Sequence, residues 1–265
     1  PELVIKKIIR SSISDLICKG VKPKYYFVAG SGNIKSFSKL NLKKISKSLN
    51  EEQKKYHILL SGGDTVFSKK LSFTITTIGF SDRIIKRNSS KINDDIYVTG
   101  NIGDSYIGLL CLKKKIKLNS INTKYFLNKY YKPDIQIKIT SKIKNIANSS
   151  IDISDGLISD LEKMINNQKL SYKIFLKNIP VSNKLSNLIN KDKLQKINCI
   201  SRGDDYQILF TANKSKKRII KNLSKSLRVK ITKIGSIQKN DLKSSIVDEN
   251  NALINLKYKG YYHKF

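Results

Sequence analysis

Acidic residues are scarce in this chain, and several of them lie in short segments with glycine or serine, which we predict to be turns beside a strand or at the edge of a helix. The sequence has 20 Asp and Glu residues against 52 Lys and Arg residues. Carboxylate oxygens are the ligands that Mg²⁺ prefers, and glycine lets a backbone approach a phosphate closely. Any one such segment is more often an ordinary turn, but together they predict a metal site beside a bound phosphate. The segments are Ser14-Asp15, Gly62-Gly63-Asp64, Gly103-Asp104-Ser105, Asp152-Ile153-Ser154-Asp155-Gly156 and Gly203-Asp204-Asp205.

The segment that contains Asp152 and Asp155 gives the sharpest signal. Ile151 to Ile153 is predicted as a short strand, and a helical pattern follows from Leu157 to Ile165. The two carboxylates therefore flank a strand-to-helix junction, where the N-terminus of the helix favours an anion. We expect a metal ion with a phosphate beside it at this junction. The alternative is that Asp155 only caps the helix.

Helical and strand-like patterns alternate along the chain, which predicts an α/β (α+β) fold. A polar stretch within residues 81–94 predicts a boundary between two domains, residues 1–90 and residues 91–265. Gly30 to Gly32 is too short for a dinucleotide-binding fingerprint and is predicted as a loop. Further predicted helices span residues 3–19, 42–56, 106–114, 183–189 and 216–227, and predicted strands span residues 25–29, 58–60, 71–80, 96–99, 172–176, 206–211 and 229–237.

The formal net charge of +32 raises the alternative of a basic nucleic-acid-binding protein. The lysines, however, are spread over every segment and form no single basic stripe with interleaved aromatic residues. Together with the many Asn, Ile and Ser residues, they are typical of a protein from an AT-rich genome. We therefore favour compositional drift and expect no nucleic-acid partner.

Other protein classes are excluded by features that the sequence lacks. No apolar run approaches the roughly 20 residues that span a membrane, and no secretory signal opens the chain. Cys18, Cys111 and Cys199 lie far apart without a C-x-x-C pair, which argues against zinc and indicates a reduced cytoplasm. The sequence has neither a G-x-x-x-x-G-K-[ST] loop nor the H-R-D and D-F-G motifs of protein kinases, so a nucleotide would be held by another scheme.

The same segments, in identity and in order, resemble those of thiamine-monophosphate kinases, and the resemblance spans essentially the whole chain. The segment Ser12 to Gly20 is similar to the family's N-L-S-D-L-A-A-M-G motif, and Gly260 to Phe265 is similar to its G-[FY]-D-H-F tail. The other matching strings are Ser61-Gly62-Gly63-Asp64-Thr65, Asp95 to Gly100 with Gly103-Asp104-Ser105, Ile151 to Leu157, and Gly203-Asp204-Asp205-Tyr206.

The resemblance implies the two-domain fold of the aminoimidazole ribonucleotide synthetase and selenophosphate synthetase superfamily, with residues 1–90 as an incomplete N-terminal domain that binds ATP and metal. It also implies Mg²⁺, ATP as co-substrate, a homodimer formed through the N-terminal sheet, and a cytoplasmic location. By position, Mg²⁺ would be bound by Asp15, Asp64, Asp152 and Asp155, ATP would be contacted by Tyr56, Gly63, Arg87 and Ser154, and thiamine monophosphate would be contacted by Asp204 and Tyr261, with Tyr262 as an alternative.

The chain departs from the family pattern at several places. The family's N-terminal segment, with a D-D-A-A type metal motif and a V-E-G-V-H-F type substrate motif, has no counterpart here. Arg202 replaces the first glycine of the G-G-[DE]-D-Y-E-L motif, and Gln207 replaces the acid that follows its tyrosine. Val66 and Phe67 follow the G-G-D-T string, where the family has an arginine.

Our leading expectation is direct, in-line transfer of the γ-phosphoryl group of ATP to the phosphate of thiamine monophosphate, which forms thiamine diphosphate. Because the acceptor phosphate is already an anionic nucleophile, the reaction needs no strong general base, and we assign no catalytic residue of that kind. The alternatives are another ATP-using enzyme of the same superfamily, a truncated inactive homologue that still binds nucleotide, and the basic nucleic-acid-binding protein.

Overall fold

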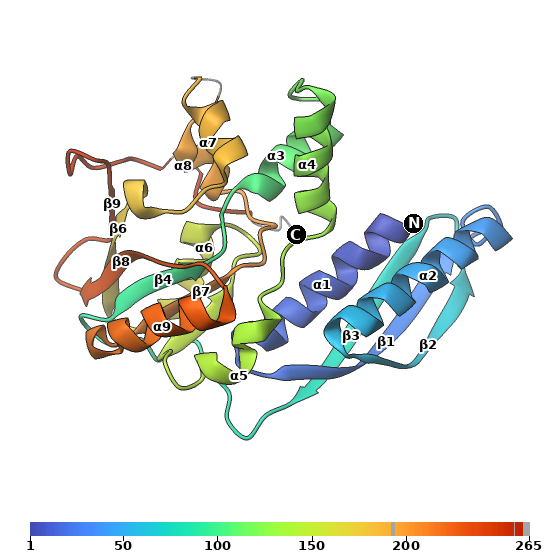
Figure 1. Ribbon diagram of the computed structural model, residues 1–265, viewed down its shortest axis with the longest axis horizontal. Coiled ribbons are helices and arrows are strands. Elements are labelled where there is room, and N and C mark those ends of the chain that lie inside the picture. Colours follow the sequence, from blue (N-terminus) through green and yellow to red (C-terminus); the bar gives the residue numbers. More distant parts are fainter. Residues whose placement is uncertain (192–193, 257, 262–265) are drawn as a thin grey trace.

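The computed structural model describes residues 1–191, 194–256 and 258–261, and its strands form two separate sheets (Figure 1). The first sheet contains β1 (Lys22–Gly32), β2 (Leu59–Phe67) and β3 (Ser72–Phe80) in the order β2-β1-β3. Strand β2 runs parallel to the central strand β1, and β3 runs antiparallel to it.

Helices α1 (Glu2–Cys18) and α2 (Lys39–Tyr56) lie side by side across one face of the first sheet (Figure 1). Arg10 of α1 donates two hydrogen bonds of 2.8 Å, from Nε and Nη2, to the carboxylate of Glu52 in α2. A third donor, Nη1, bonds the carbonyl of Pro133 at 3.1 Å. This buried fork therefore fixes α1 to α2 and also to the segment that follows α4.

The second sheet has the strand order β5-β7-β4-β8-β6-β9. Its strands pair antiparallel, except that β9 runs parallel to β6. The strands are β4 (Asp95–Thr99), β5 (Ser149–Asp152), β6 (Leu170–Phe175), β7 (Ile208–Ala212), β8 (Ile231–Lys239) and β9 (Ser245–Val247). The helices are α3 (Asp104–Leu112), α4 (Ser120–Tyr131), α5 (Thr140–Ile143), α6 (Leu157–Ile165), α7 (Asn183–Ile189), α8 (Lys196–Ile200) and α9 (Lys217–Leu227).

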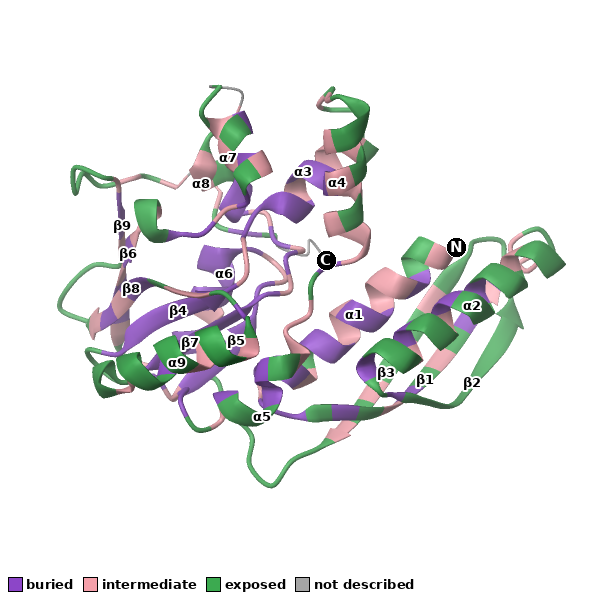
Figure 2. Cartoon of the chain, viewed as in Figure 1, coloured by how far each residue is buried: buried purple, intermediate pink, exposed green. Residues whose placement is uncertain are grey.

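Both faces of the second sheet are covered, so its central strands are buried throughout, whereas β2 is exposed (Figure 2). Tyr97 of β4 belongs to the apolar core that also contains residues of α1 and α9, while Ile96 and Val98 belong to the core beneath α6. The alternation follows from the period of two in a strand. Helix α1 contributes Ile5, Ile9, Ile13 and Ile17 to the first core, together with residues of both sheets.

Two predictions about the first sheet were wrong. Gly30 to Gly32 is part of β1, and the Gly62-Gly63-Asp64 segment is an extended part of β2, not a turn. A Cβ atom on Gly63 would lie 1.8 Å from the carbonyl oxygen of Val28 in β1. The glycine is therefore needed for close approach of two paired strands, a use that sequence spacing does not separate from a turn.

In the part of the chain that the structure describes, every helix is too short or too polar to span a lipid bilayer.

Candidate active site

A cavity of about 130 Å³ lies where the C-terminal end of α1 meets the junction between β5 and α6. Segments that are far apart in the sequence meet in it. The predicted site residues that line it are Asp15, Arg87, Asp152, Ser154 and Asp155. Lys19, Asp160 and Lys163 also line it, so its walls carry charges of both signs.

The turn after β5 is held in place by a carboxylate of the helix that follows. Oδ2 of Asp160 accepts hydrogen bonds from the backbone N–H groups of Ser154 (3.0 Å), Asp155 (2.9 Å) and Gly156 (3.1 Å). We expected the amide of Ser154 and the helix N-terminus to face a phosphate. Because the amides of Ser154, Asp155 and Gly156 already bond Asp160, they do not face a phosphate, and the assignment of Ser154 to ATP stays a prediction.

Asp15 and Asp152 form a close pair of acids across the cavity. Asp152 is buried, and Asp15 is exposed at the last turn of α1. Burial, followed by the charge of Asp15, raises the pKa of Asp152 to about 7. The Ser14 hydroxyl, which donates a hydrogen bond of 2.7 Å to Oδ2 of Asp152, acts in the opposite direction. The site therefore carries negative charge that the protein compensates only in part.

Asp155 and Arg87 complete the charged lining of the cavity. Asp155 forms an ion pair with Lys163, which also contacts Asp160 at 3.2 Å. Arg87 lies in the exposed segment between the two sheets. The cavity thus has a buried acidic side, at Asp152, and a basic rim, which matches a divalent cation and the phosphates that accompany it.

The two predicted substrate residues attach to the same turn through their backbones. The N–H group of Asp204 donates to the carbonyl oxygen of Ser154 at 2.8 Å, and the N–H group of Tyr261 donates to that of Asp155 at 2.9 Å. The structure therefore brings Asp204 and Tyr261 next to the predicted metal and ATP residues. Tyr262, the alternative aromatic contact, lies outside the described residues.

Three of the predicted metal and ATP residues do not line this cavity. Asp64 and Gly63 lie on the exposed edge strand β2. Tyr56 ends α2 and is only 2% exposed, with its ring 5.7 Å from the guanidinium carbon of Arg10. Their assignments to metal and ATP stay predictions.

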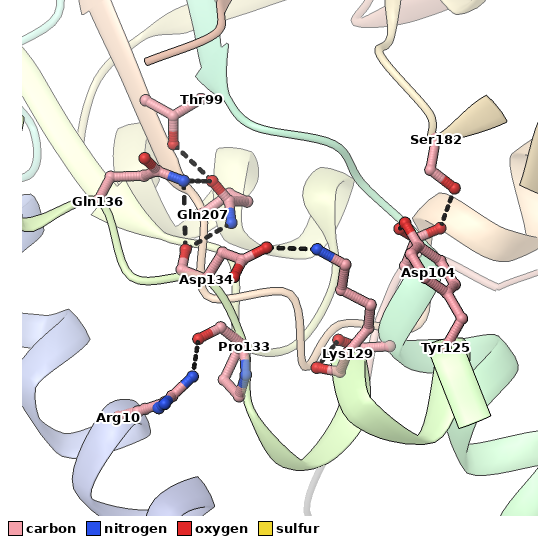
Figure 3. A network of polar contacts seen from close by, with 11 residues as sticks. Arg10, Thr99, Asp104, Tyr125, Lys129, Pro133, Asp134, Gln136, Ser182 and Gln207 are labelled. Atoms are coloured by element: carbon pink, nitrogen blue, oxygen red, sulfur yellow. Dashed lines mark hydrogen bonds and ion pairs between the residues drawn. The ribbon is translucent and has the colours of Figure 1, made fainter. Parts of the chain in front are cut away.

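The acids of the Gly103-Asp104 and Asp204-Asp205 segments have structural partners. Asp104 accepts a hydrogen bond from the hydroxyl of Ser182 at 2.7 Å (Figure 3) and another from the hydroxyl of Tyr125 at 2.9 Å. Both carboxylate oxygens of Asp205 accept from the N–H group of Gly103. Burial raises the pKa of Asp205 well above its usual value. These two acids shape the loops near the site and do not join the cluster that we expected.

Gln207, which stands where the family pattern has an acid, uses both the nitrogen and the oxygen of its amide in hydrogen bonds. Its Nε2 donates to the carbonyl of Asp134 at 2.8 Å, and its Oε1 accepts from Thr99 Oγ1 (2.9 Å) and Gln136 Nε2 (3.0 Å) (Figure 3). An ionised carboxylate has no proton to donate to the Asp134 carbonyl. The substitution therefore fits this chain's own network.

Sequence reasoning missed Asp160 and Lys163, and it named Ser14 only as the neighbour of Asp15. The spacing of Asp160 and Lys163, three residues apart on α6, is a signal for an ion pair on one helix face. No signal in the sequence shows that Asp160 turns back to bond three amides, because that depends on the conformation of the turn. The hydroxyl of Ser14 can bond Asp152 only because α1 packs against β5, a contact that the sequence does not reveal.

The carboxylates that line the cavity supply some, but not all, of the ligands that a magnesium ion needs. Among the described residues, no three His, Cys, Asp or Glu side chains lie close enough to form a metal site by themselves. Asp15 and Asp152 nevertheless offer carboxylate oxygens in one cavity, with negative charge left over. Mg²⁺ is commonly held by one or two carboxylates, with waters and substrate phosphates filling the remaining positions. The residues present therefore fit a metal that binds together with a nucleotide.

Comparisons with known proteins define the class to which this fold belongs. A family model for "AIR synthase related protein, N-terminal domain" matches residues 1–81. The crystal structure of thiamine monophosphate kinase from Aquifex aeolicus superposes with a TM-score of 0.82 at 23% identity, covering 96% of this chain and 82% of that one. The structure of AaThiL complexed with AMPPCP and TMP gives a TM-score of 0.84 at 22% identity, covering 99% and 81%. The chain has the fold of the AIR synthase-related proteins, as its sequence predicted.

A closer relative identifies the family. The thiamine-monophosphate kinase of Buchnera aphidicola subsp. Acyrthosiphon pisum (strain APS) is 33% identical over 267 residues, which cover 99% of this chain and 81% of that protein. The chain belongs to the thiamine-monophosphate kinase family, and the resemblance seen in its motifs is confirmed.

Proposed function

We propose that this protein transfers the γ-phosphoryl group of ATP to thiamine monophosphate and forms thiamine diphosphate. One observation carries the proposal: Asp204 and Tyr261, predicted to contact the acceptor, bond the backbone of Ser154 and Asp155 in the turn that lines the acidic cavity. The residues predicted to contact thiamine monophosphate and those predicted to contact ATP and metal thus meet at one turn. Family membership supports the same reaction, and a protein of the same fold is known in complex with AMPPCP and TMP.

The proposed reaction is a direct, in-line transfer. The phosphate of thiamine monophosphate is anionic at neutral pH, so the protein has to position two anions and neutralise their charge. Arg87, Lys19 and Lys163 line the cavity and are the cations available to lower that repulsion. Ser154 and Asp155 would fix the distance between the two phosphates, since they lie between the cavity and the acceptor residues.

We propose Mg²⁺ as the cofactor, held by Asp15 and Asp152, with Asp155 next to them in the same cavity. When bound, the ion supplies charge neutralisation and an oxygen template for the phosphates. From the family pattern, we propose Asp64 as a further ligand of Mg²⁺. The same pattern supports contacts to ATP from Tyr56, Gly63, Arg87 and Ser154.

We propose that the protein acts as a homodimer through the open face of its first sheet. Strands β1, β2 and β3 expose large apolar side chains, namely Phe27, Leu59, Ile78 and Phe80. Tyr25 of β1 is paired with Leu59 of β2 and with Ile78 of β3, and its ring contacts the ring of Phe80. An uncovered apolar face of this kind is typical of a protein–protein interface.

We further propose two domains that meet near residue 90, because β3 ends at Phe80, β4 begins at Asp95, and the two sheets share no strand. A cytoplasmic location is proposed as well, since Cys18, Cys111 and Cys199 are all unpaired.

The test is an acceptor panel with the purified chain, Mg²⁺ and radiolabelled ATP. We expect label in thiamine diphosphate when thiamine monophosphate is present, and no transfer to an aminoimidazole-synthesis substrate or to water. Transfer to another acceptor would favour a different enzyme of the superfamily. Nucleotide binding without transfer to any acceptor would favour an inactive homologue.

A further inference from the structure

A lysine of α1, half-buried but with a buried ammonium group, reaches across to the loop that carries the predicted acceptor residue. The Nζ atom of Lys7 lies 2.6 Å from Oδ1 of Asp204, and the Lys7 side chain is 14% exposed. The ammonium group also lies 4.2 Å from the ring centroid of Tyr130 and 4.9 Å from that of Tyr206. Burial lowers the pKa of Lys7, while the charge of Asp204 opposes this shift. The lysine is therefore enclosed by one acid and two aromatic faces.

The contacts around Asp204 all fix one of its two carboxylate oxygens. The hydroxyl of Tyr206 donates to the same Oδ1 at 3.2 Å. In the described part of the chain, Oδ2 has no polar contact, and the Asp204 side chain remains 29% exposed. One oxygen is thus held by the protein, and the other is left without a polar partner among the described residues.

The backbone of this loop is strained at two positions. Asp204 (φ 63°) and Tyr206 (φ 51°) both adopt the left-handed conformation, although neither is glycine. Such conformations cost free energy and persist where the surroundings enforce them. The bond from the Asp204 N–H to Ser154 and the ion pair with Lys7 enforce the first of them.

Stability alone is a poor explanation for the pair. Burying an ammonium group is costly, and a buried ion pair contributes little net stability compared with apolar residues of similar size. Helix α1 also carries Ser14, which bonds Asp152, and Asp15, which lines the cavity. Lys7 therefore ties Asp204 to the same helix that positions Asp15 and Asp152, the predicted metal ligands.

We propose that Lys7 is a positioning residue for the acceptor: it holds Asp204 so that the free carboxylate oxygen meets thiamine monophosphate. The inference rests on the proposed function and deepens it. Because Lys7 acts through Asp204, its loss weakens acceptor binding and leaves ATP binding nearly intact.

The experiment is a double-mutant cycle with Lys7→Met, Asp204→Asn and the double variant, measured as KM for thiamine monophosphate and KM for ATP. Each single variant should raise the acceptor KM about tenfold and change the ATP KM by less than about twofold. The double variant should be no worse than Asp204→Asn, because Lys7 has no carboxylate left to position. Lys6→Met is the matched control, since neighbouring Lys6 pairs with Glu51 on α2 and should leave both constants unchanged.

An unchanged acceptor KM in Lys7→Met, or effects of the two changes that multiply in the double variant, would overturn the positioning role. An equal rise of both KM values would point to a structural role and also contradict it. Should Lys7→Met fail to fold, Lys7→Gln takes its place in the same cycle. A wild-type chain that makes no thiamine diphosphate contradicts the proposed function itself, which separates the two failures.

Discussion

The hydroxyl of Ser14 on α1 donates a hydrogen bond of 2.7 Å to Oδ2 of Asp152 at the end of β5. The contact joins residues 138 positions apart and places Asp15, the next residue on α1, beside the buried acid. Burial of Asp152 raises the pKa of its carboxyl group, and repulsion by Asp15 adds to the effect, so that this pKa is about 7.

Replacing Asp152 by Asn should stabilise the metal-free protein at pH 8. The carboxyl group keeps its proton in the folded state up to a pKa of about 7 but loses it near 3.8 in the unfolded chain. The unfolded state therefore loses its proton first, and stability falls as the pH rises through this window. We expect the variant to gain about 1–3 kcal/mol at pH 8 and almost nothing at pH 4.

Urea unfolding in EDTA at both pH values measures this gain. Asp241→Asn, an exposed acid in a turn, is the control and should show no pH-dependent change. Equal destabilisation of Asp152→Asn at both pH values would mean that the acid pair is not strained.

Binding of the metal should weaken below neutral pH, because a protonated Asp152 offers no charge to a cation. With a pKa of about 7, the ionised fraction falls about tenfold between pH 8 and pH 6. We expect the dissociation constant for Mn²⁺, measured by calorimetry without nucleotide, to rise by a similar factor. In Asp152→Asn, binding should be weak at both pH values. A wild-type constant that does not change with pH would contradict the prediction.

Arg202, where the family has a glycine, should hold the C-terminal segment in place. Its guanidinium carbon lies 3.6 Å from the ring centroid of Tyr258 and 5.5 Å from that of Tyr106. Arg202→Ala removes the stacking, worth about 1 kcal/mol, so the amide of Tyr261 should exchange with deuterium several-fold faster. Tyr258→Phe keeps the aromatic face and should exchange at the wild-type rate. Unaltered exchange in Arg202→Ala would show that the stack does not anchor the segment.

A charge on the open face of the first sheet should disrupt the proposed dimer. Phe80 is 63% exposed there, and Ile121 on α4 is an equally apolar residue that is 71% exposed elsewhere. Sedimentation velocity should give a dimer for the wild type and for Ile121→Asp, and a monomer for Phe80→Asp. A wild-type monomer, or a dimer that survives Phe80→Asp, would contradict this interface.

Much of the fold is readable from local sequence patterns. The helix at Asn183–Ile189 was predicted with its observed bounds, and the alternation in β3 matches its half-buried pattern. The turn after β5 was also predicted, because an apolar strand, two acids and a glycine precede a clear helical stripe. These signals are local, so they need no knowledge of tertiary contacts.

The remaining features depend on contacts between distant segments. Gly63 looks like a turn residue until β1 lies against it, and Asp104 looks like a metal ligand until Ser182 and Tyr125 bond it. Lys7 is one of many lysines in the sequence, and only the fold shows that it reaches Asp204. Net charge and spacing carry no information on such pairs.

The most direct test of the central claim is phosphoryl transfer by Asp152→Asn, measured with radiolabelled ATP, Mg²⁺ and thiamine monophosphate beside the wild type and Asp241→Asn. We expect thiamine diphosphate from the wild type and from Asp241→Asn, and none from a folded Asp152→Asn protein at any Mg²⁺ concentration. Transfer by Asp152→Asn at the wild-type rate would contradict the claim that this cavity is the site of the reaction.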